Sequence, residues 1–273
     1  MALPVNQAVS EILPMPFTTL LVALLAVFGP VTHAIAFQES GCGVGQCRDC
    51  HELSKPDAEK LLKDMVSEVL TVQDSEVPGL WMVEVRQNDR KFPVYIDYSK
   101  RFVVSGNVIR IATQENLTRE KVIEMNRVDV SQIPLEDALV LGSRQAANRI
   151  IVFDDPECSY CQKLQPEMQA VVAQRPDIAF YIKMFPLQSH PTAYDKAKAI
   201  VCAASLGLLE DSLAGKPIPA ATCAGEAVDQ NIALGARLRI NSTPTLILGD
   251  GRVIPGFKPA DRMIELVGEP PKE

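Results

Sequence analysis

Two cysteines separated by two residues, Cys158 and Cys161, are the part of this 273-residue chain best suited to chemistry. They follow the apolar run 150–153 (Ile-Ile-Val-Phe), which predicts a buried strand, and a short acidic turn, and they open a stretch that predicts a helix. A sulfur at a helix N-terminus faces unpaired backbone N–H groups and the positive end of the helix dipole, and both favour the thiolate. The arrangement predicts a redox dithiol in which Cys158 attacks a disulfide and Cys161 resolves the mixed disulfide.

The same CxxC pattern also occurs in zinc sites and in structural disulfides. A zinc site requires two further ligands. The chain after the pair offers only three residues of a suitable type, none at ligand spacing: His190, Cys202 and Cys223. The strand, turn and helix around the pair therefore favour redox use over metal binding.

Composition argues against some classes of function. The formal net charge of −7 disfavours a nucleic-acid partner. With one Trp and five Tyr, the chain indicates no aromatic platform for stacking bases. Apolar residues make up 47% of the chain, enough for ordinary globular cores, and the length of 273 residues predicts two domains.

The N-terminal residues 1–36 are interpreted as a signal peptide. Residues 17–35 are apolar and uncharged, and Ala34-x-Ala36 matches a signal-peptidase site. The usual basic residues before the apolar run are missing, and Glu11 stands there instead. An uncleaved N-terminal anchor is the alternative, because the run is nearly long enough to span a bilayer. Both interpretations place the rest of the chain in the periplasm, where disulfides persist.

A cysteine-rich segment, residues 37–53, carries four groups that could bind a cofactor or a metal: Cys42, Cys47, Cys50 and His51. Cys47-x-x-Cys50-His51 is the attachment pattern of c-type haem, with His51 as one axial ligand and either Met65 or Met82 as the other. The four groups could instead hold zinc or another soft metal. A local disulfide with one spare thiol is the third interpretation, and the sequence leaves all three open.

Residues 54–115 predict a small α+β domain without a catalytic constellation. Ser54 is a candidate N-cap for an amphipathic helix that extends to Val72. Strands are predicted at 81–85, 92–97 and 102–111, the last with a turn at Ser105-Gly106-Asn107. Residues 116–147 are interpreted as a partly helical linker.

Residues 148–273 predict a second domain in which strands and helices alternate. An Asp250-Gly251 pair between two apolar runs indicates a hairpin. The predicted order is β–α–β–α–α–β–β–α. After the strand and helix around the CxxC, the expected elements are a strand at 178–185, helices at 193–208 and 227–238, the hairpin at 246–254 and a helix at 259–267.

The second domain resembles the thioredoxin superfamily, and more closely the periplasmic disulfide isomerases of the DsbC/DsbG family. Three motifs carry the resemblance. They are Val-Phe-x-Asp-x-x-Cys-x-Tyr-Cys-x-Lys-Leu around the cysteine pair, Ser242-Thr243-Pro244-Thr245, and Val-Ile-Pro-Gly-Phe-Lys-Pro at 253–259. The resemblance covers the whole second domain, extends more weakly over residues 54–145 and does not include the segment from Cys42 to His51.

The resemblance implies a C-terminal thioredoxin-like domain and a smaller N-terminal α+β domain of the cystatin-like, dimerising type. It implies a cis peptide at Thr243–Pro244 beside the CxxC, where the backbone of Thr243 would pair with a client strand. It also implies a structural disulfide between Cys202 and Cys223. A second redox pair is the alternative use of those two cysteines.

By this resemblance the protein is expected to be an exported thiol:disulfide isomerase that reshuffles or reduces incorrect disulfides in unfolded or misoxidised secreted proteins. It would act as a homodimer, be kept reduced by a membrane-linked thiol reductant, and need no cofactor beyond its own redox-active disulfide. The alternatives are a dedicated thiol reductase, an electron-transfer protein with covalent haem at Cys47 and Cys50, and a thioredoxin-like module that only binds.

The electrostatics of the cysteine pair contain two opposing contributions. Three carboxylates close in sequence oppose thiolate formation at Cys158: Asp154, Asp155 and Glu157. The helix N-terminus is expected to outweigh them. Thioredoxins often place a buried acid at the position that is Val152 here, so the sequence identifies no proton acceptor for Cys161. Lys183, on the neighbouring predicted strand, is the remaining candidate.

Overall fold

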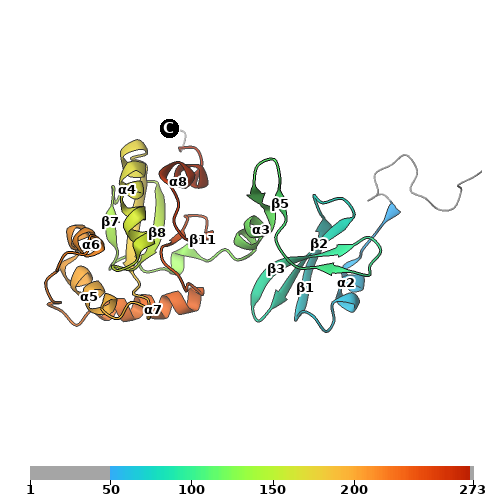
Figure 1. Ribbon diagram of the computed structural model, residues 1–273, viewed down its shortest axis with the longest axis horizontal. Coiled ribbons are helices and arrows are strands. Elements are labelled where there is room, and N and C mark those ends of the chain that lie inside the picture. Colours follow the sequence, from blue (N-terminus) through green and yellow to red (C-terminus); the bar gives the residue numbers. More distant parts are fainter. Residues whose placement is uncertain (1–49, 271–273) are drawn as a thin grey trace, which may run out of the picture. The chain divides into compact units, whose positions relative to one another are not determined.

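The computed structural model describes residues 50–270. The predicted signal peptide or anchor, residues 1–36, and nearly all of the cysteine-rich segment lie outside the described residues. Among residues 50–270, no helix combines the length and the hydropathy needed to cross a bilayer. The two domains are described separately below and are drawn in Figure 1.

The first domain is an antiparallel sheet with the strand order β1-β2-β3-β4 and one short helix. The side chain of Ser54 caps the helix by accepting a hydrogen bond from the Asp57 N–H, as its position predicted. The elements are α2 (Lys55–Leu61), β1 (Glu68–Asp74), β2 (Leu80–Gln87), β3 (Arg90–Asp97) and β4 (Val103–Val104).

The predicted helix from Ser54 to Val72 is wrong in its second half, which forms strand β1. Val69 and Val72 pair with Val85 and Val83 of β2, and Val69 is buried against the sheet core. β-Branched residues fit a pleated surface, so partner strands outweigh the helical spacing of the same apolar residues. On β2, the alternating residues Trp81, Val83 and Val85 are buried and form the centre of this domain's core.

The stretch 102–111 forms two short strands separated at the turn predicted at Ser105-Gly106-Asn107, and the linker begins as part of the first domain. β4 is followed by a separate two-stranded ribbon of β5 (Ile109–Arg110) and β6 (Glu115–Asn116). Helix α3 (Leu117–Met125) then packs on β3, where the hydroxyls of Tyr95 and Thr118 lie 2.9 Å apart. The 3-10 helix η2 (Val130–Gln132) follows.

The second domain has a five-stranded sheet with the order β11-β10-β8-β9-β7. Only β8 and β9 are parallel. Edge strand β7 comes from the predicted linker, which therefore contributes to this sheet. The strands are β7 (Leu139–Leu141), β8 (Asn148–Asp154), β9 (Ile178–Met184), β10 (Thr245–Ile247) and β11 (Val253–Pro255). The helices are α4 (Ser159–Gln174), α5 (Ala193–Ala203), α6 (Leu206–Leu213), α7 (Glu226–Leu238) and α8 (Ala260–Val267).

Both faces of this sheet are covered (Figure 1). On one face, Ile150 and Val152 of β8 pack with α4, α6 and α8. On the other face, Ile151 and Phe153 pack with α7 and with the chain around Ile133. Alternate β8 residues therefore point to different cores, which explains the continuous apolar run that predicted a buried strand. The predicted Asp250–Gly251 hairpin is confirmed, and Gly251 adopts a φ of 87°.

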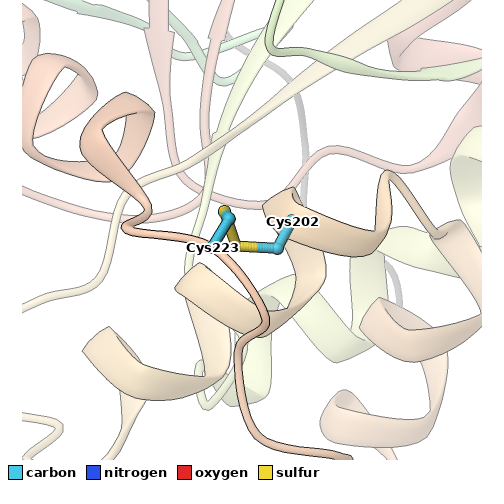
Figure 2. Close-up of a disulfide and its surroundings, with 2 residues drawn as sticks. All are labelled: Cys202 and Cys223. Carbon is cyan, nitrogen blue, oxygen red and sulfur yellow. A yellow bond between two sulfur atoms is a disulfide. The ribbon is translucent and has the colours of Figure 1, made fainter.

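A disulfide joins Cys202, in α5, to Cys223, in the loop before α7, as Figure 2 shows. The two residues are 21 positions apart and their Cα atoms lie 5.6 Å apart. The segment it closes contains helix α6, whose Leu209 and Leu213 are buried in the core, and the crosslink ties the loop after this helix to the end of α5.

Removing this disulfide is expected to cost stability and leave the CxxC chemistry intact. For Cys202→Ala with Cys223→Ala, the free energy of unfolding should fall by about 3 kcal/mol, because the unfolded chain regains the entropy of an open loop. Urea unfolding followed by circular dichroism measures the loss, and titration of the reduced dithiol is the control. An unchanged unfolding midpoint would contradict a stabilising role.

Candidate active site

Cys158 lies at the N-terminus of α4, where the chain turns from β8 into the helix. It occupies the N-cap position, and no other side chain caps this end. Cys158 is 7% exposed and Cys161, one turn into the helix, is fully buried. Both cysteines are thiols in the structure. The predicted strand–turn–helix setting of the pair is confirmed.

The pKa of Cys158 is lowered to about 5. The largest cause is a hydrogen bond from the Cys161 thiol. Thr243 and the backbone N–H groups of Tyr160 and Cys161 act in the same direction, while burial opposes them. The pKa is lowered in the expected direction, and the Cys161 thiol contributes more to it than the backbone N–H groups of the helix N-terminus do.

Cys161 has the opposite character. Burial raises the pKa of its thiol far above the ordinary value, and the negative charges of Cys158 and Asp154 add to the effect. The dithiol therefore contains one group that attacks without a base and one that reacts only after losing a proton.

The loop that contains Thr243 and Pro244 closes over Cys158. The Thr243–Pro244 peptide is cis, and the Thr243 carbonyl oxygen lies 3.4 Å from the Cys158 sulfur, 85 residues away in sequence. Strand β10 brings the loop there, because Thr245 pairs with Phe153 at the end of β8. The Pro244 carbonyl accepts a hydrogen bond from the Gly256 N–H at 2.8 Å, which ties the loop to the Val-Ile-Pro-Gly-Phe-Lys-Pro motif at 253–259.

Two of the three neighbouring carboxylates are engaged away from the sulfur. Asp155 is fully buried and accepts hydrogen bonds from the Glu157 and Leu187 N–H groups at 2.7 Å and from His190 Nδ1 at 2.8 Å. It holds the turn before the helix, a role that sequence analysis missed because Leu187 and His190 come from a distant loop.

Glu157 points to helix α5. It accepts a hydrogen bond from the Lys196 ammonium at 2.6 Å and another from the Thr192 hydroxyl. Burial acts to raise the pKa of Glu157, but these two hydrogen bonds lower it overall. Its charge is therefore balanced by Lys196 instead of opposing Cys158.

Asp154 differs from the other two carboxylates. It is fully buried, and its carboxyl oxygens have no hydrogen-bond partner other than the Cys161 thiol, which acts to lower its pKa. Burial raises its pKa well above the ordinary value, and the neighbouring charges of Cys158 and Asp155 raise it further. From the sequence, Asp154 is recognised only as an unfavourable charge. The alternation along the predicted strand nevertheless places its side chain on the same face as Val152.

The suggestion that Lys183 serves as a proton acceptor for Cys161 is wrong. Lys183 lies on the opposite face of the sheet, next to Tyr181 and Phe185 of the other core. Its ammonium forms an ion pair with Asp137 and donates a hydrogen bond to the Pro134 carbonyl at 2.7 Å. The period of two along β9 explains the placement, since Ile182 and Met184 face the dithiol side.

The haem interpretation of the cysteine-rich segment is not supported. Cys50 is disulfide-bonded, so its sulfur carries no thiol that could form a thioether to haem. The His51 ring stacks on Tyr98 with ring centroids 5.0 Å apart. Cys42 and Cys47 lie outside the described residues. Within the described part of the chain, no group of three or more His, Cys, Asp or Glu residues is placed to hold a metal ion.

Two family models match the chain, one for each domain. Residues 52–119 match the disulfide bond isomerase protein N-terminal domain, and residues 135–269 match the thioredoxin-like domain. Both ranges agree with the observed folds, including strand β7, which lies inside the second match.

Curated relatives carry names of the same kind. A probable thiol:disulfide interchange protein DsbC of Bordetella avium is 32% identical over 63% of this chain and 60% of its own length. The thiol:disulfide interchange protein DsbC of Escherichia coli K12 is 27% identical over 64% of this chain and 73% of its own length. A solved disulfide interchange protein of Neisseria gonorrhoeae is 26% identical, over 50% of this chain and 96% of that one, with a TM-score of 0.43.

The match spans 60% of the length of the first of these relatives. This chain itself contains both domain types, residues 52–119 followed by residues 135–269, together with a buried dithiol at the start of a helix. The chain belongs to the DsbC-type thiol:disulfide interchange proteins.

Proposed function

We propose that this protein is an exported thiol:disulfide isomerase with Cys158 as its nucleophile. The observation that carries the proposal is the pairing of a low-pKa thiolate at Cys158 with a buried thiol at Cys161. Such a pair attacks a client disulfide readily and closes on itself slowly, which leaves time for the client to rearrange. Its only cofactor is the dithiol itself.

In the first step, the Cys158 thiolate attacks one sulfur of a client disulfide. A bond forms between Cys158 and that sulfur, and the other client sulfur leaves as a thiolate. If this client thiolate attacks another client disulfide, shuffling proceeds and Cys158 is released unchanged. If the Cys161 thiolate attacks Cys158 instead, the client is reduced by two electrons and the enzyme pair is oxidised to a disulfide.

The client is proposed to lie along the loop at Thr243. An extended segment paired with the Thr243 backbone would place its disulfide over Cys158, because the Thr243 carbonyl already lies 3.4 Å from that sulfur. The Tyr160 side chain, 57% exposed beside the cysteines, offers an apolar surface to an unfolded chain. Unfolded or misoxidised secreted proteins fit such a site because the contacts are mostly to backbone.

The first domain is proposed to join two copies of the chain. Strand β4 is an edge strand of the sheet, and large apolar side chains at and after it are exposed: Phe102, Val104, Ile109 and Ile111. Exposed apolar residues beside an unpaired strand edge are typical of a surface that another chain covers. A homodimer in the periplasm, kept reduced by a membrane-linked thiol reductant, completes the proposal.

The test is the refolding of a scrambled multi-disulfide substrate by the reduced full-length protein. Wild type should restore substrate activity, and Cys158→Ser should fall to the uncatalysed rate because the attacking thiolate is gone. Cys161→Ser is the matched control, since it keeps the nucleophile and should accumulate a mixed disulfide with the client.

Two experimental outcomes would contradict the proposed isomerase function. A reduced wild-type protein that reduces simple disulfides without restoring the scrambled substrate would be a dedicated thiol reductase. Full activity in Cys158→Ser would place the chemistry elsewhere in the chain.

A further inference from the structure

The buried carboxyl of Asp154 has no structural task in the fold. It is the last residue of β8 and is fully buried, and apart from the Cys161 thiol, which lowers its pKa through a hydrogen bond, its oxygens have no hydrogen-bond partner. A buried polar group without a partner lowers stability, and most such groups in proteins have partners. By contrast, Asp155 next to it accepts three hydrogen bonds and orders the loop.

Asp154 faces the dithiol. Ile150 and Val152 belong to the core cluster that contains Cys158 and Cys161, and Asp154 is the next residue on that face of β8. The titratable groups around it are Cys158 and Cys161 from α4 and Asp155 from the turn. On β9 its register partner is the apolar Met184, and Lys183 points to the opposite face.

Cys161 needs a base inside the protein. Its residue is fully buried, so bulk water does not reach the thiol in this structure. The oxygens of Asp155 already accept hydrogen bonds from three donors, and Glu157 is turned toward Lys196. Among the described residues, Asp154 is the carboxylate on this face that has no partner other than the Cys161 thiol.

We propose that Asp154 is the acid–base group of the resolving step and takes the proton from the Cys161 thiol. The inference rests on the proposed dithiol chemistry and adds a residue to it. Strand alternation along β8 places Asp154 on the same face as Val152, which packs in the cluster that contains both cysteines.

The Asp154 carboxylate accepts the Cys161 proton, and the Cys161 thiolate attacks the sulfur of Cys158 in the mixed disulfide. The Cys158–Cys161 bond forms while the bond from Cys158 to the client sulfur breaks. The client leaves as a thiolate and takes a proton from water. The two enzyme thiols lose two electrons, which the client disulfide gains.

The electrostatics support this exchange. Burial raises the pKa of Asp154 and the pKa of Cys161 in the same direction. A carboxylate with a raised pKa is a stronger base than an ordinary one, and general bases work best when their pKa is close to the operating pH. In the mixed disulfide Cys158 no longer carries a charge, so Asp154 loses one of the two repulsions that raise its pKa.

The experiment follows the enzyme in one turnover with oxidised glutathione. Cys158 attacks it to give a glutathione mixed disulfide, which Cys161 then resolves. Rapid acid quenching and mass spectrometry give the rate of each step as a function of pH. In Asp154→Asn the resolving step should slow on the order of 100-fold and lose the wild-type pH inflection, because the amide cannot accept the proton. The attack step should change little.

Glu157→Gln is the matched control. It removes a carboxylate that adjoins Cys158 in sequence but points to Lys196, so the resolving step should keep its wild-type rate and pH profile. Asp154→Ala serves as the second variant if Asp154→Asn does not fold, and thermal unfolding checks both. Resolution at the wild-type rate and with the wild-type pH profile in an Asp154 variant would overturn the inference.

The glutathione assay separates this inference from the proposed function. It contains no protein client, so it reports on Asp154 whether the enzyme isomerises or only reduces. Refolding of the scrambled substrate by wild type tests the isomerase proposal alone. A slow resolving step in Asp154→Asn supports the inference even if wild type fails to refold that substrate.

Discussion

Iodoacetamide is expected to modify Cys158 roughly tenfold faster in the folded, reduced protein than in the urea-unfolded protein at pH 6, and to leave Cys161 unmodified. The reason is the difference in ionisation. At pH 6 a thiol with the ordinary pKa of 9.0 is about 0.1% thiolate, whereas Cys158 with a pKa of about 5 is about 90% thiolate. That ratio alone would accelerate the reaction several hundredfold.

The lower basicity of the thiolate removes most of this advantage. Nucleophilicity falls with pKa with a coefficient of about 0.4–0.5, which amounts to roughly 60-fold over the four units between the two states. About tenfold therefore remains at pH 6. At pH 9, where the unfolded thiol is half ionised, the folded protein should react more slowly than the unfolded one, by about 30-fold.

Peptide mass mapping after timed labelling gives the rates at each pH. The folded rate at Cys158 should rise with a midpoint near pH 5 and stay flat above about pH 7. Cys202 and Cys223 are joined in a disulfide and provide unlabelled internal controls. A midpoint near 9 for Cys158, or labelling of Cys161 at pH 7, would contradict the assignment of nucleophile and resolving thiol.

Asp137→Ala is expected to lower the free energy of unfolding by about 3 kcal/mol. The substitution leaves the Lys183 ammonium buried without its counter-ion, because Lys183 is only 1% exposed. It also removes the acceptor of the Asn231 amide, which donates to Asp137 at 2.9 Å. Removing one partner of a buried pair typically costs 3–5 kcal/mol, and the lower end applies since the Asp137 side chain is 18% exposed.

A surface pair of the same domain provides the control. Asp211→Ala removes the partner of Lys216, but these side chains are 44% and 64% exposed, so the effect should stay below about 0.5 kcal/mol. Replacing both members of the buried pair, Asp137→Ala with Lys183→Met, should recover much of the loss, since no unpaired buried charge remains.

Urea unfolding followed by far-UV circular dichroism measures these changes. The fluorescence of Trp81, the single Trp of the chain, reports on the first domain and serves as an internal reference. Equal unfolding midpoints for Asp137→Ala and Asp211→Ala would show that the buried pair contributes nothing to stability.

The local patterns of the chain determined much of its structure. The apolar run, the turn and the CxxC predicted a strand followed by a helix with Cys158 at its N-terminus, and this is what the fold contains. Such features depend on residues close in sequence, because a helix start, a buried strand or an Asp-Gly turn is decided by a few neighbours. The depressed pKa of Cys158 follows partly from this local geometry, through Cys161 and the backbone N–H groups, and partly from Thr243, which is 85 residues away in sequence.

Where local patterns allowed two structures, packing decided. The spacing of apolar residues after Leu62 suits a helix, but part of this segment pairs with β2 and forms strand β1 instead. The short apolar segment at β7 reads as linker until β9 supplies its partner. A strand's hydrogen bonds lie with other segments, so the strand cannot be recognised from its own residues alone.

The roles of the charged residues near the dithiol were decided almost wholly by the tertiary structure. From the sequence alone, Asp154, Asp155 and Glu157 are all unfavourable charges near Cys158. In the fold, Glu157 binds Lys196 and Asp155 accepts a hydrogen bond from the distant loop at Leu187. Asp154 is buried against Cys161. Lys183 is sent to the opposite face. The pKa and the role of each group depend on its burial and on partners brought from elsewhere in the chain, and only the packed fold specifies these.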